Sequence, residues 1–118
     1  MSIVSKDQLL GRRIAGRTKE VEIAGLGTVR LRYPLFSQWY AWVLEQNKLG
    51  GAAVPPSVIA STIAMCLANE DGTPMLSEDE AGELLDLEPA LVVSLYEVCK
   101  ATIASASDDK AVEDEEGN

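Results

Sequence analysis

The chain has 118 residues, of which 47% are hydrophobic and 25% are charged, a composition typical of one globular domain with a modest core. Its net charge of -9 is unevenly spread: residues 1–32 carry seven basic and three acidic residues, and residues 33–118 carry three basic and sixteen acidic ones. This distribution argues against nucleic acid as the partner, because nucleic-acid readers usually present a basic face over the folded core. The chain contains no histidine, which excludes Ser-His-Asp and Cys-His catalysis and most zinc sites.

The N-terminal region is predicted to be a mobile basic arm over residues 1–19, with residues 5–10 as a short helical turn. Its cluster of basic residues, 11–19, is open to two interpretations: a solvated arm, or a contact with phosphate or an acidic partner. No long apolar run follows the N-terminal charges, so we expect no signal peptide. The uncharged stretch 49–69 is interrupted by Pro55 and Pro56, which leaves about a dozen helical residues where a membrane span needs about 20. These features predict a protein with neither a signal peptide nor a membrane span.

Two segments of alternating polarity predict a β-hairpin. Residues 20–23 alternate glutamates with Val21 and Ile23, and residues 29–33 alternate large apolar residues with two arginines. The segment 24–27, Ala-Gly-Leu-Gly, supplies a turn between them. We expect the two glutamates to face the two arginines across the strands, which is a favourable cross-strand pairing.

Four helices are predicted after Pro34 ends the second strand. Serine, proline and glycine at their ends give the boundaries. The fold class is therefore α+β and mainly helical, with one domain over residues 20–104. The segment 105–118 has six acidic residues and one lysine, and we expect it to be a disordered acidic tail. The predicted helices run from Ser37 to about Lys48, from Pro55 to about Ala68, from Ser77 to about Leu85, and from Pro89 to about Ala104.

Residues 69–80, Asn-Glu-Asp-Gly-Thr-Pro-Met-Leu-Ser-Glu-Asp-Glu, form the densest run of acidic and turn residues. Aligned on its glycine, the EF-hand pattern would begin at Leu67, whose side chain has no oxygen, and would place Pro74 two residues after the glycine. A calcium site needs six to eight oxygen ligands, so we predict none here. Ser77 and Glu80 instead fit a capping box, and the run is interpreted as a joint between two helices.

No other pattern indicates catalysis. Cys66 and Cys99 lie in apolar helical patterns and are interpreted as buried free thiols, with a disulfide as the alternative. The segment 25–30 lacks the third glycine of a dinucleotide loop and leads into a strand. We therefore expect no catalytic residue, no metal and no cofactor, that is, a protein that is not an enzyme.

The helix from Ser37 to Lys48 carries an apolar arc of about 200°, wider than the roughly 100° that one core contact requires. Either the helix is wedged between the hairpin and the other helices, or one flank faces a partner. We expect Trp42→Ala to weaken partner binding while the fold survives. The neighbouring helix has a back face of small uncharged residues, Ser57, Ser61, Ala64 and Ala68. The candidate partner-binding residues are Trp39, Tyr40, Trp42 and Leu44.

Residues 21–32 read V-x-I-x-G-L-G-x-V-x-L-R and lead into the aromatic helix; a small-residue helix, a D-G-T-P turn and a serine-capped pair of short helices follow. Over residues 19–104 this order resembles the tail assembly chaperones of long-tailed, siphovirus-type bacteriophages. The resemblance implies a protein that binds the tape measure protein, helps recruit tail tube subunits, acts in the cytoplasm of the infected host, and is absent from the mature virion. It implies no catalytic residue.

Two other functions and one further partner are kept as hypotheses. The same small domain could serve as a structural head–tail connector or minor tail protein of the virion. A small regulator that uses the basic N-terminal arm on nucleic acid is a third class. Self-association is kept as a further partner hypothesis.

Overall fold

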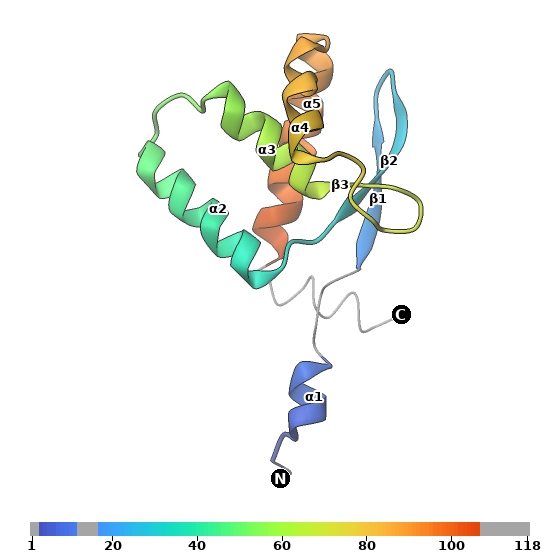
Figure 1. Ribbon diagram of the computed structural model, residues 1–118, viewed down its shortest axis with the longest axis vertical. Coiled ribbons are helices and arrows are strands. Elements are labelled where there is room, and N and C mark those ends of the chain that lie inside the picture. The colour runs from blue at the N-terminus through green and yellow to red at the C-terminus, as the bar shows by residue number, and fades with distance from the viewer. Residues whose placement is uncertain (1–2, 12–16, 107–118) are drawn as a thin grey trace.

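A computed structural model of the chain describes residues 3–11 and 17–106. Its centre is a three-stranded antiparallel sheet in the order β1-β2-β3, with α3 and α5 packed beside it (Figure 1). Over the described residues the chain has five α-helices and one 3-10 helix besides this sheet, so the predicted α+β, mainly helical fold is confirmed. Residues 1–2 and 12–16 of the predicted arm and residues 107–118 of the predicted tail lie outside the described part of the chain. The folded part extends slightly into both segments, because Thr18 and Lys19 belong to the first strand and Ser105 to the last helix.

The predicted hairpin is present as β1 (Thr18–Ile23) and β2 (Gly27–Arg32). The turn between them contains Gly25 at φ 83°, a left-handed conformation that side chains disfavour. One of the two expected charge pairs forms, because Glu20 lies opposite Arg30 and their side chains are 2.7 Å apart. The other is out of register: the next glutamate of β1 faces Thr28, and the last arginine of β2 faces Thr18.

The third strand, β3 (Leu67–Ala68), corrects the predicted end of the second helix, which was expected to reach Ala68. The helix α3 (Pro56–Cys66) stops two residues earlier, and the chain then pairs with β2, with Leu67 opposite Leu31. The following loop folds back, and Met75 N–H donates to the Leu67 carbonyl at 3.1 Å. This two-residue segment pairs with β2 on one side and with the following loop on the other. Such tertiary pairing outweighs the helical periodicity of the local sequence.

The aromatic helix, α2 (Phe36–Leu49), begins one residue before the predicted Ser37 cap. The side-chain oxygen Oε1 of Gln38 accepts a hydrogen bond from Leu35 N–H at 2.9 Å, so this glutamine closes the first turn in place of a serine. The helix ends at Gly50 in the left-handed conformation, as the glycine pair predicts.

The remaining helices follow the predicted boundaries closely. The N-terminal α1 is capped by Ser5, and its five residues are all exposed. The short α4 continues into the 3-10 helix η1, and the long α5 starts at a proline as expected. Their bounds are Lys6–Leu10 for α1, Glu78–Ala81 for α4, Gly82–Asp86 for η1 and Pro89–Ser105 for α5.

The core lies between the sheet, α3 and α5. It is built from β-branched and other apolar residues of these elements, with Leu84 of η1 closing one side. In contrast, α2 buries none of its fourteen residues. Figure 1 places α2 on the opposite side of α3 and α5 from the hairpin. The most deeply buried core residues are Leu31, Ile63, Cys66, Cys99 and Ile103.

Candidate functional site

The acidic run of residues 69–80 is a self-satisfied turn followed by a helix cap. Asp71 Oδ1 accepts hydrogen bonds from the Thr73 hydroxyl at 2.6 Å and from Thr73 N–H at 3.0 Å. These bonds hold the pKa of Asp71 below its ordinary value. The loop is closed by Asn69 N–H, which donates to the Thr73 carbonyl at 2.8 Å. In the part of the chain that the structure describes, no group of three Cys, Asp or Glu side chains is placed to hold a metal ion.

The capping box at the start of α4 is confirmed. Glu80 N–H donates to Ser77 Oγ at 3.2 Å, and Ser77 N–H donates to Glu80 Oε1 at 2.9 Å. The bonds from the Ser77 backbone and side chain lower the pKa of Glu80. The carboxylate is thus stabilised as a charged cap at a helix N-terminus, where the helix dipole favours it.

The two cysteines are buried free thiols, as expected. The thiol of Cys66 points at the Cys99 carbonyl with a separation of 3.9 Å, so the two residues face each other between α3 and α5. A side-chain hydrogen bond with Cys66, followed by burial, raises the pKa of the Cys99 thiol. Reactive cysteines have lowered pKa values and some exposure, whereas the pKa of Cys99 is raised and both cysteines are buried.

The four candidate partner-binding residues of α2 lie on two different faces of the helix. Trp39 and Trp42 are half-buried and pack against the core. Tyr40 is 50% exposed and Leu44 is 44% exposed. The structure therefore places the two tryptophans on the inner side of α2 and the other two residues on its outer side.

Phe36 joins the outer side, and sequence reasoning missed it. It is 73% exposed, and its ring stacks on Tyr40 with ring centroids 5.8 Å apart. Residues 36, 40 and 44 are spaced by four and form one continuous line on the helix. On a helical wheel Phe36 lies near the centre of the apolar arc, so the pattern alone does not single it out as an exposed residue. We name Phe36, Tyr40 and Leu44 the outer stripe.

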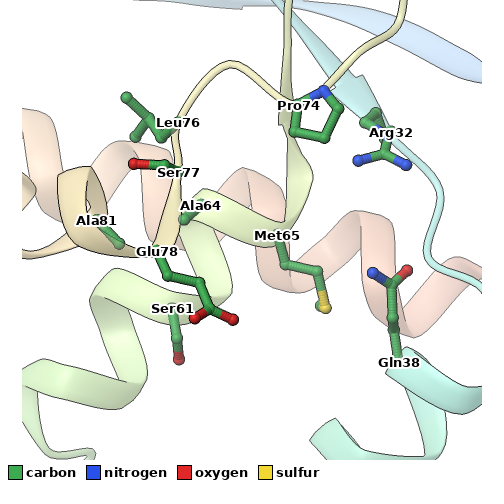
Figure 2. Close-up of a pocket in the computed structure, with 10 residues that line it drawn as sticks. All are labelled: Arg32, Gln38, Ser61, Ala64, Met65, Pro74, Leu76, Ser77, Glu78 and Ala81. Carbon is green, nitrogen blue, oxygen red and sulfur yellow. The ribbon is translucent and has the colours of Figure 1, made fainter.

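A groove runs along the opposite flank of α2, over the small-residue face of α3. One cavity of about 590 Å³ lies between α2, α3 and α4, and a second of about 310 Å³ lies between α2 and α3. The two share Gln38, Ser61 and Met65, so they form one groove, which we name the α3 groove. Figure 2 shows the larger cavity, with Met65 projecting into the space between Arg32 and Glu78 at its two ends. The predicted back face of α3 thus forms the floor of this groove through Ser61 and Ala64.

The helices of the described residues include none that is both long and apolar enough to span a membrane. Of the predicted basic cluster, residues 12–16 lie outside the described residues, and Lys19 lies in β1 with its ammonium 6.0 Å from the centre of the Tyr33 ring.

A comparison of the chain with protein-family models, with curated proteins and with solved structures found no match.

Proposed function

We propose that this protein is a tail assembly chaperone of a long-tailed bacteriophage. In this role it binds the tape measure protein in the cytoplasm of the infected host, helps recruit tail tube subunits, and is absent from the mature virion. The observation that carries the proposal is the outer stripe, an exposed aromatic line on a helix that buries none of its residues.

The outer stripe has the properties of a client-binding surface. Aromatic side chains give a large apolar contact area at a low cost in conformational entropy, and they are common anchors of protein interfaces. Covering Phe36 and Tyr40 would remove apolar area from water, which favours a complex. A helix with an uncovered aromatic face is typical of a protein that works with a partner.

The charge of the chain supports the same role. A chaperone that holds an apolar client must keep the loaded complex in solution, and a net charge far from zero does this by repulsion. The chain carries -9 overall, and residues 33–118 alone carry -13, from three basic and sixteen acidic residues. Tyr40 and Leu44 belong to this acidic part of the sequence.

Co-expression with the tape measure protein of the same genome tests the proposal. We expect the soluble fraction of the tape measure protein to rise when the chain is present and the two to co-purify. A variant with Phe36, Tyr40 and Leu44 all changed to Gln, the stripe variant, should lose this effect because Gln retains helix propensity but removes the apolar line. A client whose solubility is unchanged by the wild-type chain would refute the function.

The outer stripe would also serve a permanent interface, as in a head–tail connector or minor tail protein. The two functions differ in the fate of the chain, because a chaperone leaves and a structural protein stays. Mass spectrometry of purified virions separates them: peptides of this chain at a stoichiometry comparable with that of the tail proteins would favour the structural function.

A further inference from the structure

The α3 groove has one wall on α2, one wall on α4 and a floor on α3. The α2 wall contributes Ala41 and Trp42, and the α4 wall contributes Glu78 and Ala81. The floor carries only small side chains at Ser61 and Ala64, so an occupant can approach α3 closely there, beside Met65, which projects into the larger cavity.

At one end of the groove lies a cation that has no counter-ion among the described residues. Arg32, the last residue of β2, forms no ion pair with any residue that the structure describes, and its buried Nε finds no hydrogen-bond acceptor there. The neighbouring arginine of the same strand, Arg30, is paired with Glu20 at 2.7 Å. A buried N–H donor without an acceptor is unfavourable, because it has lost its hydrogen bonds to water and gained none in return.

Two further unsatisfied donors lie along the inner side of α2. Among the described residues, the indole Nε1 of Trp42 and the amide Nε2 of Gln46 are buried with no hydrogen-bond partner. Trp42 also lines the groove. All three unsatisfied groups, on Arg32, Trp42 and Gln46, are N–H donors, and Arg32 and Trp42 line the groove, so an occupant that supplies acceptors would complement them.

We propose that the α3 groove binds an amphipathic helix of the client, with a carboxylate of that helix placed at Arg32. This inference rests on the proposed function, because the client supplies the helix. An acidic side chain would give Arg32 a bidentate partner, the arrangement that guanidinium geometry favours. The opposite end of the groove carries Glu78 in the first turn of α4, so a basic residue of the occupant fits there.

The groove geometry selects a helix over an extended strand. An added strand needs a free sheet edge, and the groove is lined mainly by helical side chains, while the nearby β3 is already paired with β2 and bridged to Pro74. Apolar side chains spaced by three and four residues on one helix can enter such a groove together. The outer stripe lies on the other flank of α2, so the client would contact α2 from both sides.

The test uses the full chain and overlapping peptides of about 20 residues, roughly 30 Å as a helix, that tile the tape measure protein. Binding is measured by calorimetry and by tryptophan fluorescence, since Trp42 lies in the groove wall. Ala41→Trp fills the groove from an exposed position on α2, and Arg32→Gln removes the charge. The matched controls are Ala101→Trp, at an exposed position on α5, and Arg30→Gln, which lines a different hollow.

We expect at least one acidic amphipathic peptide to bind, and both groove variants to weaken it by about tenfold or more while the controls bind as the wild type does. A peptide with its acidic residue changed to the amide should bind the wild type and Arg32→Gln equally. If the peptides bind the groove variants as tightly as the wild type while the stripe variant loses them, the groove inference is overturned and the chaperone function stands. If neither the client nor any peptide binds the wild type, the groove inference and the chaperone function are both overturned.

Discussion

The rings of Phe36 and Tyr40 stack with their centroids 5.8 Å apart on the outer side of α2, away from the core. Stacking fixes the two rings as one flat apolar surface before any partner arrives. A surface that is already ordered loses less entropy on binding than one that must be assembled. This pair is therefore the centre of the outer stripe, and its removal should affect binding without affecting folding.

The stripe variant carries Phe36→Gln, Tyr40→Gln and Leu44→Gln. Its free energy of unfolding should differ from that of the wild type by no more than about 0.5 kcal/mol per site, because exposed substitutions away from caps and cores have small effects. Its retention of the tape measure protein should fall by at least about tenfold. Urea denaturation measures the first quantity, and co-purification yield measures the second.

A matched control exists on another part of the surface. Leu85, Leu87 and Val93 are exposed apolar residues of η1, the following turn and α5. Changing all three to Gln removes a comparable amount of apolar surface outside α2. Equal loss of client in this control and in the stripe variant would mean that general hydrophobicity, and not the stripe, holds the client.

Trp42→Ala should destabilise the fold, by about 2 kcal/mol, because the half-buried indole packs against the core and its removal leaves a cavity. From the sequence alone the fold is expected to survive this change; from the structure we expect it to lose stability as well. The measurement is the free energy of unfolding from urea titration monitored by circular dichroism. Tyr40→Ala, on the outer side of the same helix, is the control and should change that free energy by about 0.5 kcal/mol or less.

The sequence predicted those parts of the fold whose signals act between neighbouring residues, and it missed a part that depends on a distant segment of the chain. The Ser77–Glu80 capping box and the alternation in residues 20–33 act between near neighbours, and both were confirmed. The strand at Leu67 depends on pairing with Leu31, thirty-six residues earlier, which no local pattern contains. A strand of only two residues forms where the tertiary fold places a partner strand beside it.

The same reasoning explains the candidate site. The helical wheel identified α2 as unusually apolar, but it could not give the direction of the core. The half-buried Trp39 and the exposed Phe36 differ by three positions, less than one turn, and only the direction of the core, against which Trp39 packs, distinguishes them. The α3 groove was likewise visible in part, as a small-residue face, whereas its walls and the unpaired Arg32 required the tertiary structure.

The cap at Ser77 should make stability depend on pH in the acidic range. The folded pKa of Glu80 lies below its ordinary value of 4.5, so its contribution is fully present above that pH and is lost as the pH falls through the lower folded value. Glu80→Gln keeps a side chain that can close the capping box but does not titrate. We expect the melting temperature of this variant to fall less steeply with acidification below pH 4.5 than that of the wild type, as scanning calorimetry would show.

Ser77→Ala provides the control for this pH dependence. It removes the hydroxyl that accepts from Glu80 N–H and should cost about 1 kcal/mol of stability at neutral pH, as the loss of an N-cap does. The acid sensitivity attributed to Glu80 should shrink in the Ser77→Ala background, because one of the bonds that lower its pKa is gone. If the melting temperatures of the wild type and of Glu80→Gln fell identically with acidification, the acid sensitivity would not come from Glu80.

The buried thiols should be unreactive in the native chain and fully reactive after unfolding. Cys66 and Cys99 are both fully buried, and the raised pKa of Cys99 removes the thiolate that would attack a disulfide reagent. Labelling with a chromogenic disulfide should therefore be at least about a hundredfold slower in native buffer than in denaturant, and its native rate should follow the opening of the α3–α5 interface. Cys66→Ala and Cys99→Ala should each destabilise the fold by about 1 kcal/mol through a small cavity, which speeds labelling of the remaining thiol. Rapid native labelling of either cysteine would show that α3 and α5 separate readily, and the packing described for the core would then be wrong.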